Sequence, residues 1–154
     1  MSIRTIGKQL NTADIAGNIV SQQFTLTFDT KLVGVHTGII IYGNPSFTDF
    51  GISIYFDNGG LIETSSLLSK AQIHTQDHAL KFVGLELSGK IYEAGVTYHA
   101  VPYISGYTGT DSSHIAWRQS YPDPQFRSGL TSILNASQAD NHPIDIVFIG
   151  DEVE

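Results

Sequence analysis

The sequence predicts an all-β protein, an antiparallel β-sandwich of the jelly-roll kind with little helix. Apolar residues alternate with polar residues or glycine in several short runs, which is the period of a strand with one buried face. Clusters of Gly, Ser, Asn and Pro separate these runs at intervals of about 8–12 residues, as turns do in sandwiches. No long stretch shows the spacing of an amphipathic helix.

Strands are expected in order along the first half of the chain. Phe24, Leu26 and Phe28 alternate with threonines, and residues 32–42 are rich in β-branched side chains. Residues 52–56 alternate again and run directly into an Asn-Gly step at Asn58-Gly59. Such a step between two alternating runs is the strongest short-range signal for a hairpin.

The second half repeats the pattern. Val83, Leu85 and Leu87 alternate with Gly84 and Glu86, and a Ser-Gly-Lys turn follows them. Three more strands are expected at residues 96–104, 113–119 and 144–149. The total is seven to nine strands.

Helix has two possible locations. Residues 67–73 contain enough Leu, Lys and Gln for a helix, but an extended conformation fits them equally well. Residues 132–139 could form one or two turns.

The 154 residues suit one domain, because no linker, repeat or low-complexity tract divides them. Residues 21–154 are expected to form the single jelly-roll domain. Residues 1–20 lack sustained alternation and are expected to be an edge segment or an N-terminal arm that docks on a neighbouring subunit.

Composition excludes several classes of protein. Only 15% of the residues are charged and 41% are hydrophobic, the reverse of a disordered chain. The absence of cysteine excludes disulfide scaffolds and thiolate metal sites. A formal net charge of -7 argues against nucleic acid or an anionic membrane as partner. The opening residues lack the apolar stretch of a signal peptide, and no apolar run is long enough to cross a bilayer.

No motif points to catalysis, a metal or a cofactor. His74 and His78 have the spacing of two zinc ligands on a helix, but no Glu follows His74 and the segment resembles a polar turn. The sequence has no Gly-x-Ser-x-Gly elbow, phosphate loop or dinucleotide fingerprint. A non-enzymatic protein is therefore expected. A glycan hydrolase remains a third-ranked alternative, since two of the fifteen acidic residues could lie 5–10 Å apart in a cleft.

Aromatic residues concentrate in the last third of the chain, beside prolines and polar side chains. Exposed rings can stack on the apolar face of a sugar while nearby polar groups bind its hydroxyls. The candidate glycan-binding residues are Tyr103, Tyr107, Trp117, Arg118, Tyr121 and Asp123, with Gln119 beside them. The alternative is that these rings fill the core of a sandwich. Trp117 is expected to be buried, whereas Tyr107 and Tyr121 lie in expected loops and are the better candidates for exposure.

One part of the sequence resembles a repeated pattern in bacterial jelly-roll modules. The resemblance rests on Leu85-Glu86-Leu87 followed by Glu93-Ala94-Gly95-Val96-Thr97-Tyr98, then on Ser113-His114-Ile115-Ala116-Trp117 and on residues 121–129. It covers roughly residues 20–150, and the matching positions are turn residues, core aromatics and strand ends.

The resemblance implies a non-catalytic sandwich, because such modules occur in phage particles and as accessory domains of secreted bacterial proteins. The leading hypothesis is a phage virion protein, either a capsid decoration subunit or a tail or fibre subunit. Its expected partners are itself and a major virion protein, and its expected location is the virion. The alternative is an extracellular carbohydrate-binding module or receptor-binding domain that uses the aromatic loops.

Overall fold

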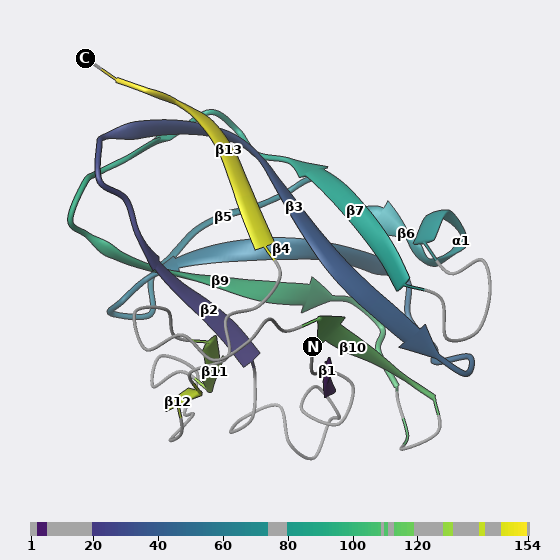
Figure 1. Cartoon of the computed structure of the whole chain (residues 1–154). Coiled ribbons are helices and arrows are strands. Elements are labelled where there is room, and N and C mark those ends of the chain that lie inside the picture. The colour runs from purple at the N-terminus through teal and green to yellow at the C-terminus, as the bar shows by residue number, and fades with distance from the viewer. Residues whose placement is uncertain are drawn as a thin grey trace.

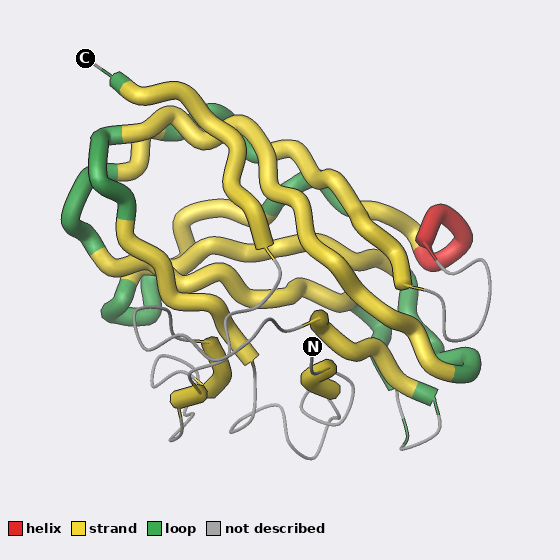
Figure 2. Tube along the Cα trace, viewed as in Figure 1, coloured by secondary structure: helices red, strands yellow, loops and turns green. Residues whose placement is uncertain are grey.

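The computed structural model describes residues 3–5, 20–73, 80–108, 110, 113–118, 128–130, 139–140 and 146–153. Over these residues the chain forms thirteen strands and one helical turn (Figure 1). The strands make two antiparallel sheets that pack together, and strand dominates the described part of the trace (Figure 2). The expected all-β sandwich is therefore confirmed, while the jelly-roll order of connections stays a prediction.

The first sheet is built around one long strand, β3 (Thr30–Tyr42). Along one side β3 pairs with β13 and β10, along the other with β7 and β8, and β1 pairs with the outer edge of β10. The bounds of these strands are β1 (Ile3–Thr5), β7 (Leu80–Glu86), β8 (Ile91–Tyr92), β10 (His114–Arg118) and β13 (Ile146–Glu152).

The second sheet has the order β12-β11-β2-β9-β4-β5, and β6 pairs with the far end of β4. The bounds are β2 (Val20–Thr25), β4 (Asp49–Phe56), β5 (Leu61–Thr64), β6 (Leu68–Ser69), β9 (Thr97–Ile104), β11 (Ser128–Leu130) and β12 (Ala139–Asp140). The turn of helix α1 (Lys70–Ile73) follows β6.

The core lies between the sheets and consists of the alternating residues that the sequence identifies. Its fully buried members come from both layers, among them Val35, Ile39, Phe50, Ile52, Ile54, Val83, Leu85 and Ile115. Burial of each such side chain contributes about 1.5–3 kcal/mol before the loss of chain entropy.

The hairpin between β4 and β5 forms where the Asn-Gly step predicts it. Gly59 has φ 95°, a left-handed conformation that favours glycine. The Asn58 Oδ1 atom accepts a hydrogen bond from the Gly60 amide at 2.9 Å, and the amide of Phe56 donates to the Gly60 carbonyl at 2.8 Å.

Several expectations about element boundaries need correction. Phe28 is exposed and lies outside β2, which ends at Thr25 before a bend. Both possibilities for residues 67–73 are realised, since Leu68 and Ser69 pair with β4 and the next four residues form a helical turn. Of the possible helix at 132–139, residues 132–138 lie outside the described part of the chain, and Ala139 begins a strand.

The N-terminal segment contains an edge strand, because Ile3–Thr5 pairs with β10. Residues 6–19 lie outside the described residues. The division of the chain at residue 20 stays a prediction.

Candidate functional site

Two of the six predicted glycan-binding residues have described side chains, and they differ in exposure. Tyr103 in β9 is 41% exposed, as a stacking platform requires. Tyr107 is only 8% exposed, so the expectation that its loop would present the ring to solvent was wrong. The ring packs into the core cluster instead. Burial raises the pKa of Tyr107, and the nearby Ile115 backbone opposes that shift, although no group lies in full hydrogen-bond geometry with the hydroxyl.

The other four candidates cannot be joined to Tyr103 as one site. Trp117 and Arg118 belong to β10, where their backbones pair with β1 and that of Trp117 also pairs with Ile39. Their side chains, together with Tyr121 and Asp123, lie outside the described residues. The six-residue glycan site therefore stays a prediction.

Tyr103 shares the outer face of the second sheet with Tyr55. In the register of β4 and β9, Tyr103 lies opposite Gly51 and Tyr55 lies opposite His99. Residues directly opposite in an antiparallel pair point to the same side of the sheet. The two tyrosines therefore lie on one face, separated by the buried pair Ser53 and Val101.

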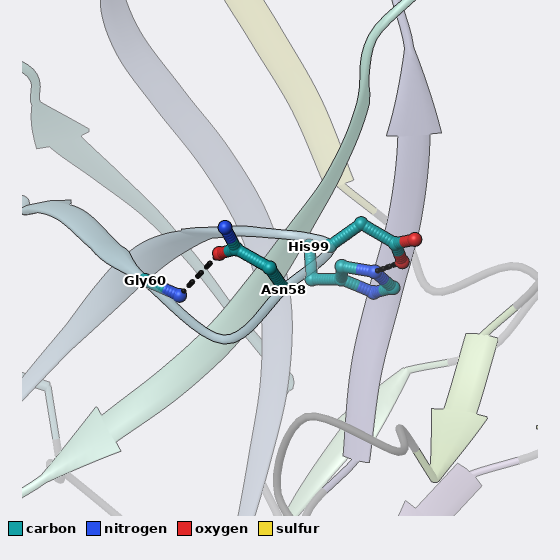
Figure 3. A network of polar contacts seen from close by, with 4 residues as sticks. Asn58, Gly60 and His99 are labelled. Carbon is teal, nitrogen blue, oxygen red and sulfur yellow. Dashed lines mark hydrogen bonds and ion pairs between the residues drawn. The ribbon is translucent and has the colours of Figure 1, made fainter.

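His99 is a buried histidine on this face, in a strand that the sequence predicts. Its Nε2 atom lies 2.7 Å from Oδ1 of Asp57, an exposed residue in the turn after β4 (Figure 3). Its Nδ1 atom is buried and has no hydrogen-bond partner among the described residues. The contact with Asp57 attaches the β4–β5 turn to the middle of the sheet.

A second polar cluster joins the two sheets and is centred on Glu63 of β5. Its Oε1 atom accepts the backbone N–H of Ser88 at 2.8 Å, and its Oε2 atom accepts the hydroxyl of Tyr92 at 2.6 Å. Tyr92 is fully buried and stands edge-on to the ring of Tyr98, with ring centroids 5.0 Å apart. Burial is the main cause that raises the pKa of Tyr92, followed by the hydrogen bond to Glu63 and its negative charge. The phenol keeps its proton, so the pair acts as a structural clamp.

A third feature is the outer face of the first sheet, which carries large apolar side chains in contact with solvent. Val147 lies opposite His36, and Ile149 lies opposite Gly34, on the β13 side of β3. Phe82 lies opposite Gly38 on the β7 side, and His36 itself is exposed between buried neighbours. These pairings place Phe82, Val147 and Ile149 on the side of the sheet away from the core.

Two further residues extend this surface toward β8. Ile91 pairs with the exposed Lys31, and Val33 is exposed beside a register shift between β3 and β13. We refer to the residues Val33, Phe82, Ile91, Val147 and Ile149 together as the apolar face. Their exposed fractions are 39% for Val33, 61% for Phe82, 59% for Ile91, 59% for Val147 and 41% for Ile149.

Glycines separate some of the apolar side chains on this face. Gly34, Gly38 and Gly84 occupy outward positions on β3 and β7. A Cβ atom at Gly84 would lie only 3.1 Å from Nε2 of His36, so the imidazole lies over this glycine. The imidazole therefore lies in the middle of the apolar face, between Phe82 on the β7 side and Val147 on the β13 side.

The sequence contained a signal for this surface. Phe82 is out of phase with Val83, Leu85 and Leu87, and residues 146–149 are apolar without a break. When Val83 faces the core, Phe82 must face outward. An alternating run identifies which residues share a face, and an unbroken apolar run indicates two apolar faces.

The described residues include neither a group of three or more His, Asp or Glu side chains that could hold a metal ion nor a helix long and apolar enough to span a membrane. Comparison of the chain with protein-family models, curated proteins and solved structures finds no match.

Proposed function

We propose that this chain is a non-enzymatic structural subunit of a phage particle, a capsid decoration protein or a tail or fibre subunit, that acts through protein–protein contacts. The observation that carries the proposal is the apolar face. Monomeric proteins rarely expose a contiguous apolar patch larger than a few hundred Å², and such patches are typical of interaction sites.

The low charge of the chain supports the same proposal. Only 15% of its residues are charged, so few charged groups must lose water when a neighbouring subunit covers the surface. Assignment to a phage particle rests on the resemblance of the strand and turn motifs to jelly-roll modules of virion proteins.

The test is reconstitution on particles produced from a genome in which this gene is deleted. The purified protein is expected to co-sediment with these particles at a saturable ratio, and particles from the intact genome should not take up more. If the protein stays in the supernatant and is also absent from purified intact particles by mass spectrometry, the proposal fails.

The second candidate function, glycan binding, is favoured by the exposed ring of Tyr103, which shares the outer face of the second sheet with Tyr55. Stacking of a ring on a sugar requires exposure of this kind. The test is binding to a glycan array by the wild-type chain and by Tyr103→Ala. Phe28→Ala is the control, since Phe28 is an exposed ring outside the sheet. A signal lost in Tyr103→Ala and kept in the control supports binding at this face. A silent array, or equal signals, eliminates it.

A further inference from the structure

We propose that the apolar face is the contact surface between two copies of this chain, with the first sheets stacked across a two-fold axis. This inference rests on the proposed function, because it identifies one partner of the structural subunit and the surface that binds it. Its occupant is a second copy, argued from charge and area.

The charge on this surface favours a second copy. The whole chain carries a formal net charge of -7, so most contacts between two copies bring like charges together. On the apolar face the register places Lys31, Glu86 and Asp151, and Lys31 lies directly opposite Asp151. These two charges offset each other and leave Glu86 at the rim. A copy of the chain therefore approaches this face with little repulsion.

The area of the face suits the centre of a dimer interface. Five partly exposed side chains of this size present on the order of 400 Å² of apolar surface, within the range of patches that are functional. A stable interface buries about 800 Å² on each partner, with an apolar centre and a polar rim. Lys31 and Glu86 are exposed and are placed to form part of that rim, whereas the exposed His36 lies in the middle of the face between Val147 and Gly84.

The test is the oligomeric state of the full chain, measured by sedimentation velocity across a concentration series. We expect a monomer–dimer equilibrium in the wild type. Val147→Lys is expected to weaken dimerisation at least tenfold, and Phe82→Lys is a second variant should the first fail to fold. Leu61→Lys is the matched control, because Leu61 is 57% exposed, lies in the other sheet and undergoes the same change of charge.

Because the chain has no cysteine, a spin label can be attached at a single introduced cysteine. This second measurement does not alter the centre of the contact. A nitroxide attached to Glu86→Cys should give a defined distance between copies in pulsed EPR. The same label on Leu61→Cys should give a different and longer distance. A wild type that stays monomeric, or a dimer weakened equally by Leu61→Lys, overturns the inference.

Failure of this inference and failure of the proposed function have different signatures. A monomer that still binds particles removes the two-fold contact and leaves the structural role. A dimer that ignores particles keeps the contact and removes that role.

Discussion

Tyr92 and Glu63 show how one buried pair of side chains joins the two sheets. The phenol donates to the carboxylate at 2.6 Å, and the other carboxylate oxygen accepts an amide from the chain beyond β7. A buried carboxylate without such donors would be costly, so the two residues stabilise the sandwich only as a pair. Their role is visible in the pH dependence of stability.

The stability of the protein is expected to fall with rising pH above about 10, the pKa of an unfolded tyrosine. The pKa of Tyr92 is raised in the fold, so the unfolded chain releases this proton while the folded chain keeps it. Below pH 10 both states hold the proton and the contribution is constant. Above pH 10 the free energy of unfolding falls by about 1.4 kcal/mol per pH unit for each such group.

Tyr107 contributes in the same direction, because burial raises its pKa as well. In Tyr92→Phe the free energy of unfolding should fall less steeply with rising pH, because the contribution of one tyrosine is removed. Urea unfolding between pH 8 and pH 11 measures both slopes. Equal slopes in the wild type and the variant would contradict the assignment of a proton-retaining phenol to Tyr92.

His99 offers a second prediction at this scale. Among the described residues the imidazole of His99 bonds to Asp57 alone, so Asp57→Ala removes that partner from a buried ring. The expected cost is about 1 kcal/mol in the free energy of unfolding. Asp57→Asn retains a side-chain oxygen and should recover most of the loss. In a His99→Phe background, Asp57→Ala should cost much less. Additive effects of the two substitutions would show that the contact is not energetically coupled.

At the scale of the element, β13 is held in register by a bulge in β3, where Val33 is the extra residue opposite the step from Ile149 to Gly150. The pairing with β3 shifts between Ile149 and Gly150, and a Cβ at Gly150 would lie 2.5 Å from the carbonyl oxygen of Lys31. That oxygen belongs to the backbone and cannot move aside without disturbing β3. Glycine is therefore required where the two strands approach most closely.

Gly150→Ala is expected to destabilise the protein by about 1–3 kcal/mol and to loosen β13. Gly95→Ala is the control, since Gly95 has a left-handed φ of 75° but nothing within 4 Å of an added Cβ. Hydrogen exchange distinguishes the two variants. Gly150→Ala should speed exchange of the β13 amides, whereas Gly95→Ala should leave those amides protected. Unchanged exchange in Gly150→Ala would show that the bulge does not fix the register.

Much of this sandwich can be predicted from alternation and turns. The runs at Ile52-Ile54 and Val83-Leu85 face the core, and the Asn58-Gly59 step turns the chain as expected. These signals are local, so a single sequence contains them. The short strands β11 and β12 were not predicted, because strands of two or three residues depend on pairing with distant neighbours. Strand β1 lies in the segment that was expected to be an edge or an arm.

The candidate site was less predictable than the fold. Tyr107 follows a strand and a Gly turn, which suggested a loop exposed to solvent, yet its ring enters the core. Whether a ring beside a loop turns inward depends on the space left by residues far away in sequence, here including Phe47 and Ile115. The polar clusters at Glu63 and His99 likewise join residues tens of positions apart.

At the scale of the whole molecule, the acidic charge of the chain opposes its own association. If two copies meet through the apolar face, added salt should tighten the dimer, because it screens repulsion between two chains of net charge -7. Sedimentation velocity between 20 and 500 mM NaCl should show a dissociation constant that falls as salt rises. A constant that rises with salt would indicate that attraction between opposite charges drives association, and would contradict an apolar contact.

The position of β3 at the centre of the first sheet also affects how the molecule is made. β3 is translated early, and its partner β13 is translated more than a hundred residues later. Until Ile146–Glu152 has emerged from the ribosome, one edge of β3 is open over most of its length, and pairing between such distant segments is slow. β13 also supplies Val147 and Ile149 to the apolar face. A nascent chain therefore lacks two of the five apolar residues until β13 has emerged, and a contact between copies through the complete apolar face forms only after that point.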